Sequence, residues 1–254
     1  MDTRIKTKQE LKAMKESGKM LASVLDILQQ EVAVGMSTKE LAMLASKELK
    51  ILGGQPAFLG YQGFPDVICI SINEEVVHGI PRQDKIIHDG DIVSLDFGVS
   101  YKGMITDSAV SIIVGRPKQQ GHINLLQDTK KALEIGIASL HDNVRTGDIG
   151  YSIEQFLSKK SYGIVRDLVG HGVGHHIHED PNIPNYGRAH TGPWLSKGMT
   201  IAIEPMVTLG TDRVRLAEDG WTILTLDGSY SAHFEHTVLI TEDGAEIITI
   251  IKSK

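Results

Sequence analysis

The stretch that most constrains the fold of this chain is residues 90–108, where two apolar, β-branched runs flank a short polar break. This pattern predicts a β-hairpin. Each run carries one acid, Asp96 in the first and Asp107 in the second. A turn centred on Tyr101 and Lys102 would place the two acids directly opposite each other on one face, with Cβ atoms roughly 4.5–5.5 Å apart.

Two carboxylates held face to face in an apolar strand context repel each other, and burying an unpaired charge is costly. The acids could share a proton, as paired carboxyl groups do. They could instead share a cation. A third arrangement relieves the repulsion by a shift of the turn, after which the acids face solvent. The hairpin alone only slightly favours the first two.

Composition narrows the class of protein. The 254 residues, 41% hydrophobic and 23% charged, are ordinary for a globular protein of one large or two small domains. A net charge of −6 gives no sign of the basic surface that would bind nucleic acid or a membrane. The single cysteine, Cys69, excludes an intramolecular disulfide and fits a reducing compartment. Because the first residues form no apolar signal core and no apolar run could span a bilayer, we expect a cytoplasmic protein without a membrane partner.

Capping signals predict the first two helices. Thr7 with Glu10, and Ser37 with Glu40, form capping boxes that precede leucines at helical spacing. Gly53 is expected to end the second helix.

Two further helices and several strands are expected in the rest of the chain. Residues 123–140 have helical periodicity, and Asp148 is expected to cap a fourth helix. Apolar runs bounded by glycine and proline predict strands at residues 67–72, along the hairpin to residue 114, and at residues 164–169, 199–207, 221–226, 234–241 and 245–251.

The order of these elements repeats. Each half runs helix, glycine, capped helix, loop and strands, and residues 90–96 parallel residues 198–204. In both copies the apolar run ends on an acid, Asp96 or Glu204. We therefore expect an α+β fold of two pseudo-symmetric halves, with antiparallel sheets covered by helices and the acids converging at the junction. No linker separates the halves, so one domain over residues 1–254 is expected, with halves of roughly 7–115 and 119–254.

Four acids lie in apolar strands: Asp96, Asp107, Glu204 and Glu235. A single strand acid usually belongs to a solvated face, but four of them, two being repeat-related, indicate a site. The segment at residues 170–181 is rich in glycine and histidine, which allow close backbone approach and supply nitrogen ligands or acid–base groups.

The histidines divide by expected role. We favour metal ligation for His171 and catalysis for His178, and packing or surface positions for His175 and His176. His78 is isolated and carries little weight by itself.

Charge balance then favours the cation over the shared proton. Four carboxylates match two divalent cations, and one neutral histidine completes a mostly oxygen ligand set that suits Mn(II), Fe(II), Co(II) or Zn(II). Such a pair of ions supports metal-assisted hydrolysis. The sequence has no nucleophile elbow, phosphate-binding loop or His-Glu-x-x-His motif, and Cys69 lies in an apolar strand where packing is its expected role.

With these residues placed, the sequence closely resembles the type I methionine aminopeptidases, which have the pita-bread fold. The resemblance covers essentially the whole chain. It rests on NEEVVHGIP at residues 73–81, DFG at 96–98, TDS at 106–108, GHGVG at 170–174, IEP at 203–205 and EHT at 235–237.

The resemblance implies that Asp96, Asp107, His171, Glu204 and Glu235 bind two divalent cations, drawn from Co, Mn, Fe(II), Zn and Ni. Asp96 would chelate one ion, Asp107 and Glu235 would bridge both, and Glu204 would also act as the general base.

The resemblance also implies the substrate contacts. His178 would stabilise the oxyanion, His78 would contact the scissile peptide nitrogen, and the free α-amine of the substrate would sit on one metal. Phe58 and Ile177 depart from the family, in which a cysteine and a phenylalanine are common at those positions. The methionine pocket would comprise Tyr61, Phe64, Cys69, His78 and Trp221, with Phe58 and Ile177 at its edge.

The implied activity is removal of the initiator methionine from nascent chains with a small second residue, by a monomer that works near the ribosome. Only 31 positions separate Glu204 from Glu235, which leaves no room for the helical insertion of the type II enzymes. Two alternatives stay open. One is an Xaa-Pro peptidase or dipeptidase of the same fold, and the other is a non-catalytic peptide-binding module, in which metal ligands would be lost.

Overall fold

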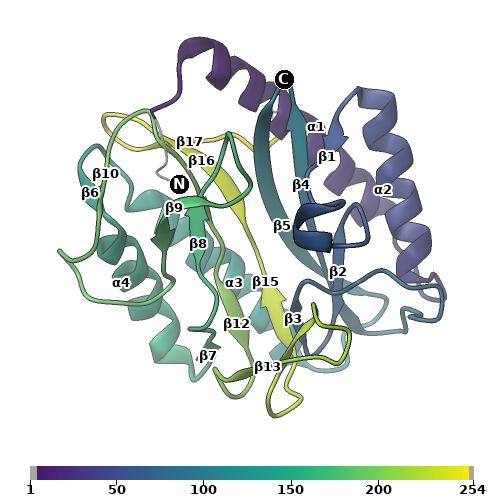
Figure 1. Ribbon diagram of the computed structural model, residues 1–254. Helices are drawn as coiled ribbons and strands as arrows, with labels where there is room; N and C mark the ends of the chain where they lie inside the picture. The colour runs from purple at the N-terminus through teal and green to yellow at the C-terminus, as the bar shows by residue number, and fades with distance from the viewer. Residues whose placement is uncertain (1–4, 252–254) are drawn as a thin grey trace.

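The computed structural model describes residues 5–251 (Figure 1). Residues 1–4, where the sequence predicts no apolar signal core, and residues 252–254 lie outside the described residues. Within residues 5–251 no helix has both the length and the apolarity that crossing a bilayer requires. The helices are α1 (Lys8–Glu31), α2 (Thr38–Leu52), α3 (Gln120–Ala138) and α4 (Thr146–Leu157), with short 3-10 turns η1 (Tyr61–Gly63) and η2 (Ser158–Lys160).

The strands of the first half pair into antiparallel sheets. The main one has the order β1-β4-β2, with β5 also paired to β4, and β3 joins a small sheet with two strands of the second half. The bounds are β1 (Gln55–Pro56), β2 (Cys69–Ile72), β3 (Glu75–Val77), β4 (Asp91–Tyr101) and β5 (Met104–Val114).

The strands of the second half are shorter and also antiparallel. The main sheet has the order β17-β16-β11-β8-β9, and smaller sheets have the orders β15-β12-β7, β13-β14-β3 and β10-β6. The bounds are β6 (Val144–Arg145), β7 (Gly163–Ile164), β8 (Gly170–Gly172), β9 (Glu179–Ile183), β10 (Trp194–Leu195), β11 (Thr200–Ile203), β12 (Met206–Thr208), β13 (Val214–Leu216), β14 (Ile223–Thr225), β15 (Ser231–His233), β16 (His236–Ile240) and β17 (Ala245–Ile247).

The helix signals of the first half are confirmed. Both capping boxes form, with Thr7 and Ser37 as the N-caps of α1 and α2. Gly53 ends α2 in the left-handed conformation at φ 82°. The expectation for Asp148 is wrong in detail, because this residue lies inside α4 and its carboxylate accepts the backbone N–H of Arg145, the actual N-cap.

The β4–β5 hairpin forms, but the predicted turn is wrong by one residue. Asp107 pairs with Gly98, and Asp96 pairs with Ala109, so the two acids are not directly opposite. The turn lies on Lys102 and Gly103, at φ 50° and 77°, and two successive left-handed residues are what the favoured two-residue hairpin turn requires. The acids still share one face, because a shift of two positions in pairing preserves the alternation of side chains.

The two faces of β4 have different roles. Val93, Leu95 and Phe97 are fully buried in a core that they form with α1 and α2. The intervening positions, including Ser94 and Asp96, point to the other face. Figure 1 shows α1 and α2 together on the outer side of this sheet, which leaves the opposite face turned toward the second half.

The second half has the same layering. Ile149 and Ile153 of α4 pack with Ile201 and Ile203 of β11 in a second core, to which α3 also contributes. Backbone hydrogen bonds of 2.9 and 3.3 Å between Ala109 and Glu235 join the halves. The strand that carries Asp107 therefore lies directly against the segment between β15 and β16 that carries Glu235.

Several predicted strands are shorter than expected. The strand expected over residues 199–207 is interrupted at Glu204 and Pro205, which divides it into β11 and β12. Proline has no N–H to donate to a sheet, so pairing stops there. The interruption removes Glu204 from the regular strand and turns its backbone carbonyl to Asn185, whose Nδ2 donates to it at 3.0 Å.

Candidate active site

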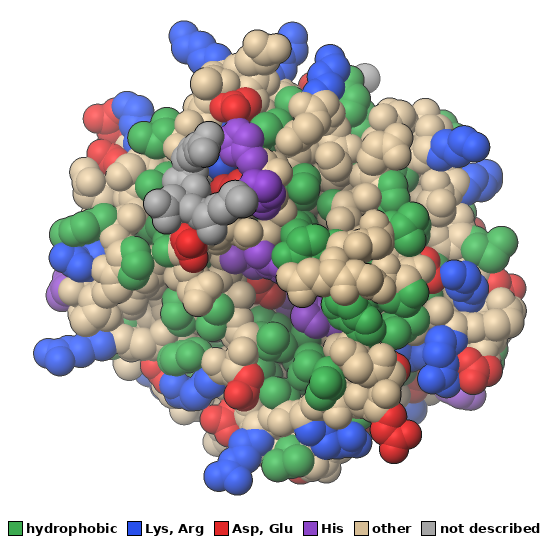
Figure 2. All heavy atoms as spheres, viewed as in Figure 1, with side chains coloured by type: hydrophobic (Ala, Val, Ile, Leu, Met, Phe, Trp, Pro, Cys, Tyr) green, Lys and Arg blue, Asp and Glu red, His purple; other side chains and the backbone are tan. Residues whose placement is uncertain are grey.

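The five predicted metal ligands meet at the junction of the two halves. Asp96 and Asp107 come from β4 and β5, and His171 comes from β8. Glu204 follows β11, and Glu235 lies between β15 and β16. All five line one pocket of about 140 Å³. Figure 2 shows histidine and acidic side chains on the floor of this central hollow.

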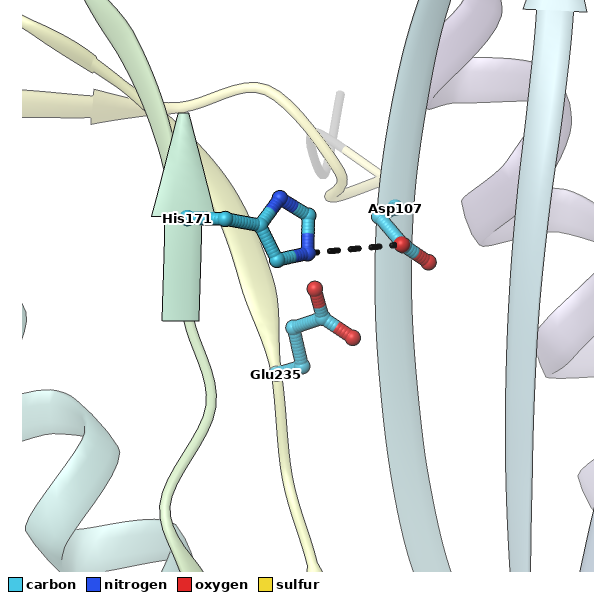
Figure 3. Close-up of side chains that lie close together, drawn as sticks. All are labelled: Asp107, His171 and Glu235. Atoms are coloured by element: carbon cyan, nitrogen blue, oxygen red, sulfur yellow. Dashed lines mark ion pairs between the residues drawn. The ribbon is translucent and has the colours of Figure 1, made fainter. Parts of the chain in front are cut away.

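Three of these residues form the tightest group. Ligand atoms of Asp107, His171 and Glu235 all lie within 4.8 Å of one another, and the three side chains point toward a common centre (Figure 3). His171 Nε2 lies 4.0 Å from Asp107 Oδ2 and 3.5 Å from Glu204 Oε1.

The imidazole of His171 is arranged as a ligand. Its Nδ1 lies 2.9 Å from the carbonyl oxygen of Gly172, which only accepts, so Nδ1 carries the proton and donates it. The lone pair of Nε2 then faces the acids. Burial lowers the pKa of His171 to about 3, with a smaller effect of His178, so the ring is neutral as metal binding requires.

The acids are costly to ionise in this arrangement. Burial raises the pKa of Asp107 to about 7. Burial, followed by repulsion from Asp107, raises the pKa values of Asp96, Glu204 and Glu235 well above their usual range. Such shifts mark a cluster of carboxyl groups that are close together and shielded from water.

Orphaned oxygen atoms show that this group of residues fits a metal. Among the described residues, Asp96 Oδ1, Asp107 Oδ1 and Glu235 Oε1 are buried side-chain atoms without a hydrogen-bond partner. Buried carboxylate oxygens normally have partners, because desolvation without compensation is costly. Three oxygen donors beside a neutral imidazole match the ligands of divalent first-row cations.

His233 is part of the site but was missed by the sequence reasoning. Its Nε2 lies 3.6 Å from Glu204 Oε2 and 4.0 Å from Glu235 Oε2. Both ring nitrogens are buried without a hydrogen-bond partner. The sequence feature that could have indicated His233 is its position two residues before Glu235, because residues two apart in an extended segment share a face.

The residues predicted to form the methionine pocket lie together. Phe58, Phe64, Cys69 and Ile177 pack in one buried cluster, with Tyr61 and Trp221 against it. The indole of Trp221 meets Phe64 edge-on at 5.2 Å between centroids. Ile177 belongs to this cluster but does not line the pocket, whereas every other predicted pocket residue does. Gln62 also lines the pocket and was not predicted.

Cys69 behaves as the packing residue that was expected. Burial, followed by the charge of Asp96, raises the pKa of the Cys69 thiol well above its usual range. A thiol held in its protonated form is a poor nucleophile.

Backbone geometry places His78 in the pocket. His78 has a left-handed φ of 60°, and Gly79 follows it with its carbonyl accepting from Ile70 N at 2.8 Å. A Cβ at Gly79 would lie 2.3 Å from Ile70 O, so only glycine allows this approach. Burial lowers the pKa of His78 to about 4.

The remaining histidines of the 170–181 segment lie as expected. His178 lines the pocket, whereas His175 and His176 do not. His175 instead contacts Glu10 at 2.8 Å. Glu179 accepts from the backbone N–H groups of His175 and His176 and from the buried Lys6 ammonium at 3.0 Å, which holds the loop around His178.

Residues 12–242 match the model of metallopeptidase family M24. The chain belongs to this family. A metallopeptidase requires a divalent cation, and the buried Asp107, His171 and Glu235 group of this M24 chain supplies a place for one.

The relatives of this M24 chain agree in length and name. It is 42% identical over 245 residues to the methionine aminopeptidase of Mycoplasma capricolum, covering 96% of this chain and 97% of the relative. The methionine aminopeptidase 1 of Bacillus subtilis is also 42% identical, over 251 residues, with coverage of 96% and 98%.

Solved structures confirm the predicted pita-bread fold. The crystal structure of methionine aminopeptidase from Thermotoga maritima has a TM-score of 0.96 at 46% identity and covers 98% of this chain and 100% of its own. The prolidase from Pyrococcus furiosus has a TM-score of 0.79 at 24% identity, with coverage of 98% and 66%, and shows the shared fold alone.

Proposed function

We propose that this chain is a methionine aminopeptidase that removes the initiator methionine from nascent proteins and peptides with a small second residue. The observation that carries the proposal is the meeting of two sets of residues in one pocket. Five candidate metal ligands form its floor, and an aromatic and sulfur-containing wall stands beside them. Relatives at about 40% identity along the whole chain carry the same name.

The proposed metal centre holds two divalent cations, drawn from Co, Mn, Fe(II), Zn and Ni. The backbone hydrogen bonds between Ala109 and Glu235 hold β5, which carries Asp107, beside the segment of Glu235, and Asp107 and Glu235 would bridge both ions. Asp96 would chelate one ion, and His171 and Glu204 would complete the set. His233, whose Nε2 lies 3.6 Å from Glu204 Oε2 and 4.0 Å from Glu235 Oε2, would help to position both carboxylates.

The reaction is hydrolysis of the first peptide bond. The cations, when bound, activate a water molecule and polarise the scissile carbonyl group. Glu204 takes a proton from the attacking water as general base. His178 donates a hydrogen bond to the developing oxyanion, and His78 contacts the scissile nitrogen. The requirement for a free α-amine beside the metals restricts cleavage to the first residue.

The apolar wall would select methionine. A flexible, polarisable thioether packs well against aromatic rings, and Phe58, Phe64 and Trp221 provide them. Phe58 stands where a cysteine is common in the family that this chain resembles, and Ile177 packs in the same buried cluster without lining the pocket. We propose that both changes reshape the pocket without changing the preference for methionine.

The localisation and partners of the protein are inferred from the proposed activity and not from particular residues. We propose a cytoplasmic monomer that acts on nascent chains near the ribosome, with no nucleic-acid specificity and no membrane partner. Residues 1–254 would form a single metallopeptidase domain, with halves of roughly 7–115 and 119–254.

Two peptide substrates test the proposal against its alternatives. The metal-loaded protein is expected to release methionine from Met-Ala-Ser and to leave Ala-Pro-Ala intact. Preference for Ala-Pro-Ala would identify an Xaa-Pro peptidase instead. Cleavage of neither peptide, with tight binding of both, would identify a binding module. Glu204→Gln serves as the inactive control, since it preserves size and removes the base.

A further inference from the structure

The hydroxyl group of Tyr61 contacts the proposed catalytic histidine. Tyr61 Oη lies 2.9 Å from His178 Nδ1, and the two rings are 5.3 Å apart between centroids. The contact joins η1 to the loop after β8, which are far apart in the sequence. Tyr61 therefore both lines the proposed methionine pocket and contacts His178.

Gln62 favours Tyr61 as the donor in this contact. Gln62 Nε2 lies 3.1 Å from Tyr61 Oη, and an amide NH₂ group can only donate. The phenolic oxygen thus already accepts one hydrogen bond, and its own proton is available for His178 Nδ1. A neutral imidazole that accepts at Nδ1 carries its proton on Nε2.

The backbone conformation of η1 turns the Gln62 side chain toward the adjacent residue, Tyr61. Gln62 has a left-handed φ of 48°, which is uncommon for a residue other than glycine, and Gly60 and Gly63 beside the turn have φ of 79° and 92°. The turn is closed by Phe64 N donating to Tyr61 O at 2.9 Å. This arrangement keeps the Gln62 amide within reach of the Tyr61 hydroxyl group.

We propose that Gln62 and Tyr61 form a donor chain that fixes His178 in the Nε2–H tautomer and directs this N–H into the pocket. Tyr61 and Gln62 are positioning residues, because they act on the reaction through His178. The inference rests on the proposed function, in which His178 donates to the oxyanion. The ring of His171, edge-on to His178 at 4.4 Å, restrains the imidazole from a second side.

Nitrogen NMR reads the tautomer directly. The full-length chain is labelled with ¹⁵N-histidine, loaded with Zn(II), which is diamagnetic, and measured at pH 8, with the His178 signals assigned by their loss in His178→Gln. The wild type is expected to show a protonated Nε2 and a bare Nδ1. In Gln62→Glu a carboxylate replaces the amide and accepts a hydrogen bond from the Tyr61 hydroxyl group. The phenolic oxygen then accepts from His178, and the protonated nitrogen switches to Nδ1.

Kinetics on Met-Ala-Ser add a second readout. Tyr61→Phe and Gln62→Glu are expected to lower kcat by about tenfold or more, in the range found for groups that orient a reacting residue, with KM changed by less than about twofold. Tyr186→Phe is the matched control, since it removes a hydroxyl group that donates to Arg166 O at 3.0 Å outside the pocket, and it should leave kcat unchanged.

Three results would overturn the donor chain: a wild-type His178 protonated at Nδ1, an unchanged tautomer in Gln62→Glu, or full kcat in Tyr61→Phe. Failure of the proposed function is distinguishable from these results. A wild-type chain with the expected tautomers that cleaves no methionyl peptide would support the donor chain and overturn the aminopeptidase.

Discussion

Asp96 and Asp107 lie on the same face of the β4–β5 hairpin, one diagonal step apart rather than directly opposite. Diagonal neighbours in a sheet are roughly 7–8 Å apart at Cα, which leaves more room between the carboxylates than a direct pair would have. This spacing suits two acids that hold cations between them. The repulsion remains, because both carboxyl groups are buried and both have raised pKa values.

Replacing Asp107 should remove both metal and activity. Asp107→Asn keeps the size of the side chain but cannot bridge two cations. Loss of a direct ligand is expected to cost more than the 10- to 100-fold typical of outer partners, so kcat/KM should fall by more than about 100-fold. Elemental analysis should show fewer metal ions per chain than in the wild type. Asp84→Asn is the control, because Asp84 pairs with Arg82 on the surface. Normal metal content in Asp107→Asn would refute its bridging role.

The metal-free protein should lose stability as pH rises from 6.5 to 8. The folded state holds protons on carboxyl groups with raised pKa, Asp107 at about 7 and Glu235 well above its usual range. The unfolded chain has released them, so unfolding becomes more favourable with pH, by up to about 1.4 kcal/mol per pH unit for each proton held. Buried histidines such as His171, with lowered pKa, act in the opposite direction just above pH 6.5, because the unfolded chain still holds part of their protons there, and this contribution fades toward pH 8.

Thermal unfolding of the chelated protein measures this slope. The melting temperature should decrease across the window, and saturating Mn(II) should abolish the decrease. Glu235→Gln should flatten the curve, since it removes one of the repelling carboxylates. A melting temperature that rises with pH in the metal-free protein would contradict the assigned shifts.

Metal uptake at pH 7 should release protons. Carboxyl groups that are partly protonated in the metal-free protein must ionise to act as ligands. Calorimetric titration with Mn(II) in two buffers of different ionisation enthalpy should give different observed enthalpies, with a sign that shows release to the buffer. Equal enthalpies would mean that the acids are already ionised, against the raised pKa of Glu204.

Breaking the Lys6–Glu179 pair should be destabilising. Both side chains are almost fully buried, with exposures of 0% and 2%. Removing one partner leaves the other charge buried, which typically costs about 3–5 kcal/mol. Lys6→Met should therefore lower the free energy of unfolding in urea by about that amount. Lys197→Met, which breaks the exposed pair with Glu242, is the control and should cost about 0–1 kcal/mol. Equal effects of the two variants would count against a structural role for Lys6.

Much of the site could be predicted because the signals were local. The capping boxes at Thr7 and Ser37 formed as predicted, since two residues three positions apart decide each of them. The four strand acids stood out because charge is rare in apolar runs, and they converge with His171 in one pocket. Resemblance to a family then supplied the expected pocket, of which only Ile177 does not line the cavity.

The rest depended on contacts between distant segments. The hairpin register followed from the left-handed Lys102 and Gly103, whereas the polar break alone suggested a turn one residue earlier. His233 was missed because its importance comes from Glu204, 29 positions away in the chain and beside it in space. Gln62 gave no sequence signal at all, since its role depends on Tyr61 meeting His178.

The most direct test of the account is a metal titration of the chelated protein, with methionine release from Met-Ala-Ser as the readout. The account predicts no activity after chelation and recovery on adding Mn(II) or Co(II) one at a time, with full recovery at two ions per chain and none in Glu204→Gln. Methionine release that persists after complete metal removal, or that is equal in Glu204→Gln and the wild type, would contradict it.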